Sequence, residues 1–202
     1  MQYWHETITQ KSLTVLQRLR KKHQFVLIGG WAVWLYTKAL KSKDIDIVVS
    51  FEELTKLRRK FNLFKNERLK KYEALIEEVD VDVYVPFYSN PGLPAEEILD
   101  SAAAYEGFLV PPPEILLILK QKTFQSRGMS TKGEKDKVDI FSLLTLSYFN
   151  WGKYKKYLEK YNLRNLLSEL QILVKETTNI PALAINPHQF FRYKKKWLAE
   201  LS

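Results

Sequence analysis

The sequence predicts an α+β fold, in which a small mixed sheet with flanking helices is followed by an α-helical C-terminal domain. The apolar run at 25–28 is typical of a buried strand and ends at a Gly-Gly pair. Acidic and apolar residues alternate at 44–50 and again at 79–85, which indicates strands with one buried face. From residue 113 onward the hydrophobic spacing is helical. These three observations together predict the fold class.

The individual elements follow from local pattern. Leu13, Leu16 and Leu19 recur at helical spacing, which predicts an amphipathic helix over 3–22. The alternation at 79–85 makes that strand the clearest of the set. The other elements expected before residue 110 are a strand at 25–28, a helix at 31–40, a strand at 44–50, a helix at 52–60, edge strands at 61–64 and 75–78, and a short helix or loop at 95–101.

The C-terminal half is predicted to be helical. Three consecutive prolines at 111–113 stiffen the link to it, so we place the domain boundary between residues 110 and 111. Residues 128–134 are expected to form a mobile loop. The expected helices span 113–126, 135–148, 151–161, 164–176 and 187–201.

Asp44 and Asp46 are the most informative pair of residues in the chain. Alternate residues on a strand share a face, so both carboxylates point the same way, roughly 6–7 Å apart. Carboxylate oxygens hold hard divalent cations, which phosphoryl and nucleotidyl transfer require. An Asp-x-Asp at a strand edge is also compatible with simple solvation, and a Gly-Gly pair with a simple turn. The order of strand, Gly-Gly, helix and acidic strand favours a metal site.

The same residues carry a resemblance to a known family. Gly-Gly, a helix and then SKDIDIVV resembles the signature of the DNA polymerase β-type nucleotidyltransferase superfamily. The stretches VPPPEILLILKQKTFQSRG and KGEKDKVDIFSLL are similar to later motifs of the AbiEii and type IV toxin nucleotidyltransferases. The resemblance covers residues 24–146. The positions that match these later motifs are Lys120, Arg127, Lys135, Asp136 and Asp139.

The resemblance implies a phosphate and metal site in the first half of the chain. Gly29 and Gly30 would let the backbone approach a triphosphate, with amides of the following helix facing the anion. Asp44 and Asp46 would hold one or two Mg²⁺ or Mn²⁺ ions. A third carboxylate of the family helps to hold the metal and activate the attacking hydroxyl. Asp80 and Asp82 compete for this role, and we favour Asp82 because D-V-Y-V-P matches the family form.

Further residues have a functional and a structural interpretation. Ser42 would bind a phosphate or serve as a turn residue. Lys120 would act at the nucleotide or extend its ammonium to solvent. Arg127 and Lys135 would add positive charge near the phosphates. Asp136 would be catalytic or would cap a helix. The resemblance favours the functional role for Lys120 and Asp136.

The activity implied by the resemblance is metal-dependent nucleotidyl transfer. The enzyme would move a nucleoside monophosphate from an NTP to an acceptor hydroxyl and release pyrophosphate. The acceptor would be a tRNA 3′ end, with the protein acting as the toxin of a toxin–antitoxin pair. Alternatives are a protein or a small molecule such as an antibiotic as the acceptor. A catalytically silent protein that binds nucleotide or nucleic acid is a further alternative.

Charge is distributed unevenly along the chain. Residues 1–110 carry 16 basic and 15 acidic groups, whereas residues 111–202 carry 16 basic and 8 acidic groups. Lysines alternate with aromatics at 153–161 and 190–197. Such a surface neutralises phosphates and stacks bases, which favours RNA as a partner. The alternative is a pair of helices whose aromatics are core and whose lysines face water.

Composition excludes several other classes of protein. The absence of cysteine rules out a disulfide or a thiol nucleophile and suits a cytoplasmic protein. His5, His23 and His188 are scattered, so no zinc site is expected. No Gly-Lys-Ser/Thr follows the glycine pair, which excludes a Walker A loop. No signal peptide and no membrane-spanning segment are predicted.

Overall fold

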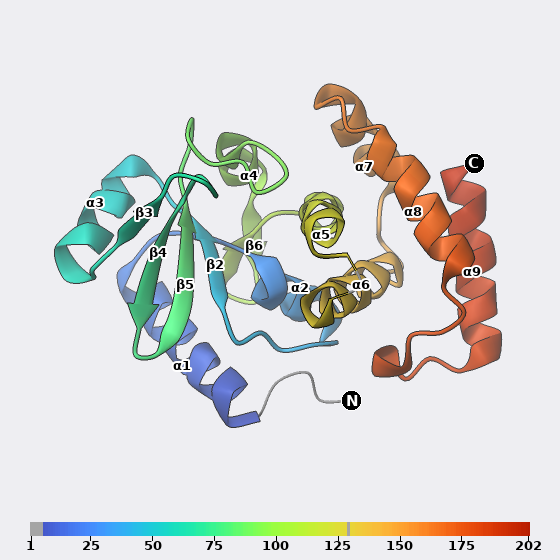
Figure 1. Ribbon diagram of the computed structural model, residues 1–202, viewed down its shortest axis with the longest axis horizontal. Coiled ribbons are helices and arrows are strands. Elements are labelled where there is room, and N and C mark those ends of the chain that lie inside the picture. Colours follow the sequence, from blue (N-terminus) through green and yellow to red (C-terminus); the bar gives the residue numbers. More distant parts are fainter. Residues whose placement is uncertain (1–5, 129) are drawn as a thin grey trace. The chain divides into compact units, whose positions relative to one another are not determined.

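The computed structural model describes residues 6–128 and 130–202 and divides after Pro112 into two units (Figure 1). The first unit combines a sheet with helices, and the second is built from helices. This is the α+β class that the sequence predicts. In chain order, the first unit contains α1 (Glu6–Lys22), β1 (Val26–Ile28), α2 (Gly29–Thr37), β2 (Ile45–Val48), α3 (Phe51–Lys60), β3 (Phe64–Asn66), β4 (Lys71–Ile76), β5 (Val79–Tyr84), α4 (Ala95–Ser101), β6 (Ala103–Tyr105) and β7 (Phe108–Val110).

The sheet is mixed and has seven strands in the order β3-β4-β5-β2-β1-β7-β6. β2 runs antiparallel to β1 and parallel to β5, so the two acidic strands are neighbours at the centre of the sheet. Asp46 is opposite Ile28 on one side and opposite Asp82 on the other. The strand order therefore brings together two carboxylates that are 36 residues apart in the chain.

Alternation along β5 separates a buried face from a polar one. Val79, Val81 and Val83 are buried, while Asp80 and Asp82 point to the other face. α1 contributes buried apolar side chains to the core of this unit, whereas α2 is apolar around most of its circumference. Both helices thus anchor the sheet, and the acids remain on its polar side.

Two hairpins of the sheet were not predicted correctly. The predicted strand at 75–78 ends instead at Ile76, because Glu77 and Glu78 form a turn with φ of 51° and 63°. Two consecutive left-handed residues make the tight turn that suits a hairpin, and glycine is the usual choice there. A second hairpin, β6–β7, was not predicted from the sequence. Its turn has φ of 46° at Glu106 and 79° at Gly107.

The second unit contains α5 (Pro113–Arg127), α6 (Thr131–Leu144), α7 (Trp151–Lys160), α8 (Asn165–Glu176), a short 3₁₀ turn (Pro181–Leu183) and α9 (Pro187–Leu201). Its core includes Tyr154 and Trp197, both at most 1% exposed. The prediction of a loop over 128–134 is wrong for most of its length. Ser130 caps α6 by accepting a hydrogen bond of 3.1 Å from the Gly133 amide, so the helix begins four residues before the predicted start.

Among the described residues, no helix is both long enough and apolar enough to cross a membrane.

Candidate active site

Carboxylates gather on the central strands of the first unit. Asp46 on β2 is in register with Asp82 on β5, and neighbouring strands lie about 4.8 Å apart. Asp44 lies just before β2, two residues from Asp46, with a side chain that is 37% exposed. Its Oδ1 is 3.9 Å from the Lys43 ammonium. Asp46 and Asp82 are therefore neighbours on the polar face, and Asp44 lies on the segment that enters β2; we call these three residues the acidic edge.

Gly29 is in direct contact with this acidic edge. It is the first residue of α2, and its φ is 66°. A Cβ at this position would lie 2.1 Å from Asp46 Oδ2, which no side chain permits. The Asp46 carboxylate thus packs against glycine backbone at the N-terminus of a helix, where amides favour negative charge. Gly30 follows in the same turn and is buried.

The two candidates for the third carboxylate lie in different surroundings. Asp82 faces Asp46 and has a side chain that is 24% exposed. Asp80 is exposed and is opposite Leu75 on β4. Burial and, second, the nearby Asp46 charge raise the pKa of Asp82 to about 6, although a hydrogen bond from Lys71 opposes the shift. Of the two residues, Asp82 is the one placed beside Asp46.

The donor chemistry of this edge fits a hard divalent cation. Carboxylate oxygens are the ligands that Mg²⁺ and Mn²⁺ prefer, and a bound cation would offset the cost of burying Asp82 and, second, its repulsion from Asp46. Nevertheless, within residues 6–128 and 130–202, no three acidic or histidine side chains converge closely enough to hold a metal. Asp82 is instead bonded to the Lys71 ammonium at 2.5 Å.

Ser42 lies in the segment that leads from α2 into β2. It is 4% exposed and precedes Asp44 by two residues. Ser42 therefore lies on the same segment as Asp44, just before the strand that carries Asp46.

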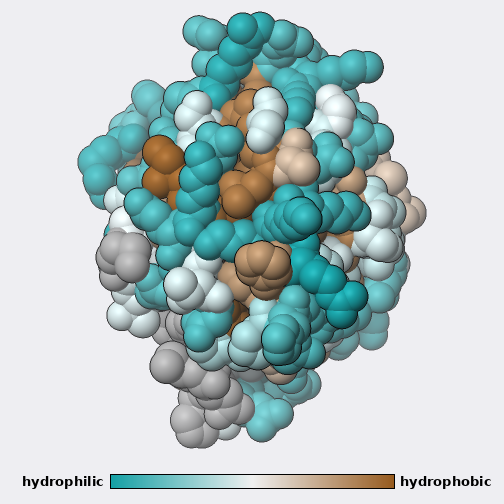
Figure 2. Space-filling view, turned by 90° about the vertical axis from the view of Figure 1, so that its right-hand side faces the viewer, coloured by the Kyte–Doolittle hydropathy of each residue, from teal (hydrophilic) through white to brown (hydrophobic). Residues whose placement is uncertain are grey.

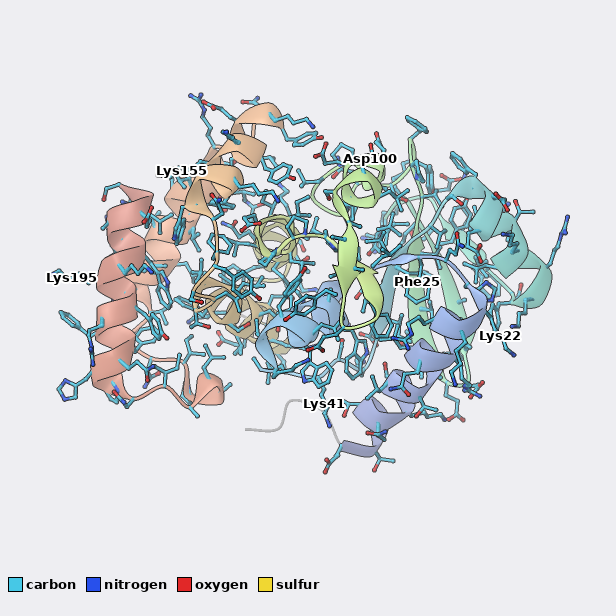
Figure 3. The ribbon with its side chains drawn as sticks, turned by 180° about the vertical axis from the view of Figure 1, so that it is seen from behind. Lys22, Phe25, Lys41, Asp100, Lys155 and Lys195 are labelled. Atoms are coloured by element: carbon cyan, nitrogen blue, oxygen red, sulfur yellow. The ribbon has the colours of Figure 1, made fainter. Side chains whose placement is uncertain are left out.

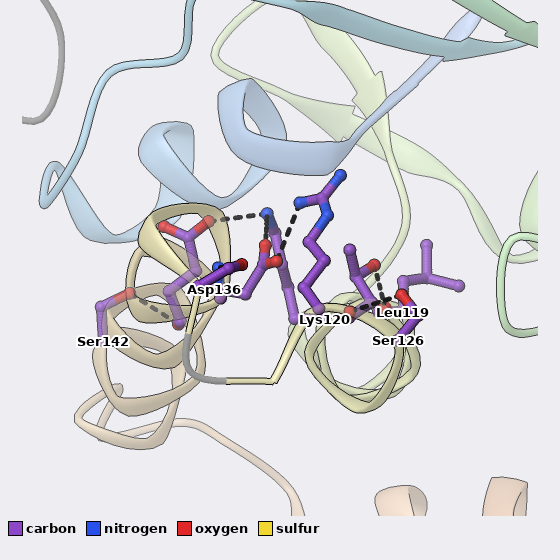
Figure 4. A network of polar contacts seen from close by, with 10 residues as sticks. Leu119, Lys120, Ser126, Asp136 and Ser142 are labelled. Carbon is purple, nitrogen blue, oxygen red and sulfur yellow. Dashed lines mark hydrogen bonds and ion pairs between the residues drawn. The ribbon is translucent and has the colours of Figure 1, made fainter.

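A second group of predicted residues forms an ion-pair network in the helical unit (Figure 4). Lys120 on α5 directs its Nζ to Asp136 Oδ1 at 3.1 Å and to Asp139 Oδ2 at 2.7 Å. Arg127, at the end of α5, donates from Nη1 to Asp136 Oδ2 at 2.8 Å. The α5–α6 pair therefore brings all of these side chains into contact.

Burial distinguishes the members of this network. The Lys120, Asp136 and Asp139 side chains are at most 10% exposed, while that of Arg127 is 41% exposed. Burial raises the pKa of Asp139, and the charges of Lys120 and Lys135 partly offset this shift. Lys135 is itself 8% exposed. The network is thus a desolvated cluster with one solvent-accessible guanidinium.

The structure corrects two structural interpretations of these residues. Lys120 does not extend to solvent, because its ammonium points inward to two aspartates. Asp136 does not cap α6, because Ser130 does. Asp139 emerges as a central member of the cluster, and its Oδ1 has no hydrogen-bond partner among the described residues. The sequence indicates this role through the spacing of Asp139, which is three residues from Asp136 and so lies on the same face of the helix.

Sequence reasoning missed Lys71 and Glu73, which lie beside Asp82. Lys71 Nζ is 2.9 Å from Glu73 Oε1, and Glu73 is opposite Asp82 in the β4–β5 ladder. No motif marks these residues. Their position depends on where β4 lies, and β4 was predicted several residues too late.

Comparison with known proteins supports the fold. No family model matches the chain, and no curated protein matches its sequence. The structure is similar to an antigenic nucleotidyltransferase-like protein from Paracoccidioides brasiliensis, with 18% identity, a TM-score of 0.50, and coverage of 88% of this chain and 92% of that one. JHP933 from Helicobacter pylori gives 13% identity, a TM-score of 0.50 and coverage of 98% and 94%.

The polyadenylate synthase of Megavirus is also similar, at 14% identity and a TM-score of 0.44 over 71% of this chain and 32% of that one. The first comparison shows that this chain shares the fold of a nucleotidyltransferase-like protein over most of its length.

Proposed function

We propose that the protein is a metal-dependent nucleotidyltransferase that moves a nucleoside monophosphate from an NTP to an acceptor hydroxyl and releases pyrophosphate. The observation that carries this proposal is the position of Asp46, in register with Asp82 and packed against Gly29 at the start of α2. The nucleotidyltransferase-like fold supports it. Carboxylates beside a glycine turn are what a cation-bound triphosphate needs.

Each residue of the acidic edge has a proposed role. Asp44, Asp46 and Asp82 would hold Mg²⁺ or Mn²⁺, which when bound neutralises the charge of the phosphates. The backbone of Gly29 and Gly30 would approach the triphosphate. The Asp82 carboxylate would also accept the proton of the attacking hydroxyl.

For the helical unit we propose that the cluster around Asp136 provides positive charge for a phosphate group. Asp136 and Asp139 hold the buried Lys120 ammonium in a fixed direction, and Asp136 shares its other oxygen with Arg127. Arg127 is bound to Asp136 through one nitrogen and is partly exposed, so its remaining N–H groups reach solvent or a ligand. Lys135 would add a further positive charge. Ser42 would bind a phosphate in the first unit.

We propose a tRNA 3′ end as the acceptor, with the protein acting as a toxin that a protein antitoxin neutralises in the cytoplasm. Support comes from the 16 basic and 8 acidic groups of residues 111–202. Lys155 on α7 and Lys195 on α9 are exposed (Figure 3). The side of the protein drawn at the right of Figure 1 is largely hydrophilic, with smaller apolar patches (Figure 2).

The aromatic residues between these lysines differ in burial: some are core, one is exposed, and Tyr157, Tyr161 and Tyr193 are half-buried. Tyr154, Phe190 and Trp197 are core side chains, at most 2% exposed, so they do not stack on a ligand. Phe191 is 68% exposed and is the residue of this run that would stack on a base. The RNA proposal therefore rests on the lysines and on Phe191.

The test is nucleotide binding followed by thermal unfolding. Each of the four NTPs is added with Mg²⁺, and the cognate NTP is expected to raise the melting temperature. Asp44→Ala and Asp46→Ala should abolish this rise, whereas Asp80→Ala, an exposed acid on the same face, should retain it. An unchanged rise in both of the first two variants would refute the metal assignment.

A further inference from the structure

Lys71 holds a carboxylate of the proposed active site. It is the first residue of β4, and its side chain is only 12% exposed. Its Nζ lies 2.5 Å from Asp82 Oδ2 and 2.9 Å from Glu73 Oε1. The ammonium thus contacts both Asp82, which is the neighbour of Asp46, and Glu73, which lies on the other side of Asp82 in the sheet.

Glu73 is a second, fixed acceptor for the same ammonium. It is opposite Asp82 in the antiparallel ladder and two residues from Lys71, so all three side chains share the polar face. Asn66 on β3 donates to Glu73 Oε1 at 3.1 Å, which orients the carboxylate. Glu73 is more exposed than Asp82, at 41% against 24%. Lys71 can therefore keep an ion pair if it leaves Asp82.

We propose that Lys71 is an internal counter-ion that competes with the divalent cation for Asp82 and transfers to Glu73 when the cation binds. The inference rests on the proposed cation site at Asp46 and Asp82. A divalent cation on Asp82 and the ammonium at its Oδ2 are like charges on one carboxylate, so their repulsion weakens the binding of each. Lys71 would thus be a positioning residue that lowers the affinity for free cation and keeps Asp82 neutralised in its absence.

The first experiment measures Mn²⁺ binding by electron paramagnetic resonance in the intact protein without nucleotide. Lys71→Met removes the competing charge, and we expect it to bind Mn²⁺ roughly tenfold more tightly than the wild type. Lys70→Met is the matched control, because Lys70 is the adjacent residue and contacts Glu67 rather than Asp82. It should change the affinity less than about twofold. Lys71→Gln repeats the test should the methionine variant fail to fold.

The second experiment separates transfer to Glu73 from a general charge effect. Glu73→Gln removes the alternative acceptor, so it should weaken Mn²⁺ binding in the wild type and have no effect in a Lys71→Met background. Additive effects of the two substitutions would overturn the transfer step. Unchanged or weaker Mn²⁺ binding by both Lys71 variants would overturn the competition itself.

Two further variants distinguish this inference from the proposed function. Asp46→Asn and Asp82→Asn should each weaken Mn²⁺ binding. If they do so while Lys71→Met has no effect, only the role of Lys71 fails. If neither weakens binding, the cation site itself is wrong, and with it the role of Lys71.

Discussion

The Asp82 carboxyl is under opposing influences from its neighbours. Burial and the charge of Asp46 raise its pKa to about 6 from an ordinary value of 3.8, against the ion pair with Lys71. Since the folded pKa is the higher one, the unfolded chain loses this proton first as the pH rises. The protonated Asp82 therefore contributes to the stability of the folded state below pH 3.8, and this contribution is lost as the pH rises through 6.

Asp82→Asn should remove this pH-dependent loss of stability, because asparagine does not titrate. We expect the variant to gain stability relative to the wild type as the pH rises from about 4.5 to 7, by about 2 kcal/mol. Urea unfolding in the presence of a chelator at several pH values measures the difference. A difference that is constant or shrinks with rising pH would contradict the assignment.

Gly29 provides a second prediction for a single residue. In Gly29→Ala the new methyl group collides with the Asp46 carboxylate, and the residue is also strained at φ 66°. We expect destabilisation of about 2–4 kcal/mol and loss of Mg²⁺-dependent NTP binding. Gly128→Ala is the control, because Gly128 has φ 54° but a methyl group there would meet no atom within 4 Å. It should lose only about 1 kcal/mol and keep NTP binding.

Sequence pattern predicts the acidic faces of β2 and β5 but not the residues that contact these acids. Alternation with buried valines and isoleucines groups Asp44 with Asp46 and Asp80 with Asp82, and only the resemblance to the family favours Asp82 over Asp80. Lys71 and Glu73 belong to a polar strand with little alternation of its own. Their contact with Asp82 depends on the register of the β4–β5 hairpin, which a turn of two glutamates sets.

The α5–α6 pair depends on charges that it buries. Lys120→Met would remove the ammonium that contacts both Asp136 and Asp139, whose side chains are at most 1% exposed. We expect a loss of about 3–5 kcal/mol in the free energy of unfolding. Lys132→Met, at an exposed position on α6, should change it by less than about 0.5 kcal/mol. Urea titration of both variants measures the difference, and equal stabilities would show that the cluster contributes little.

Helices were easier to predict than short strands. Apolar spacing located α5, α7, α8 and α9 to within a few residues of their ends. β6 and β7 were missed because three-residue strands of the sequence Ala-Ala-Tyr and Phe-Leu-Val carry too little periodicity. Their pairing is set instead by the left-handed turn at Glu106 and Gly107.

Charge is the property that distinguishes the two units as wholes. The formal charge of +9 lies almost entirely in residues 111–202. If this half binds tRNA, the affinity should fall steeply between about 50 and 200 mM KCl, and replacing Lys155 and Lys156 by glutamine should lower the slope by about 2. The pair Lys21→Gln and Lys22→Gln, in the balanced first unit, should leave the slope unchanged. Filter binding across the salt range measures both.

The central claim is that Asp46 belongs to a nucleotidyl transfer site. The most direct measurement is transfer of label from each α-³²P NTP, with Mg²⁺, to total tRNA and to the protein itself, in the wild type, Asp46→Asn and Asp80→Asn. We expect labelled tRNA from one NTP, a loss of about 1000-fold in Asp46→Asn, and near-normal transfer in Asp80→Asn. Undiminished transfer in Asp46→Asn, or no label on any acceptor in the wild type, would contradict this claim.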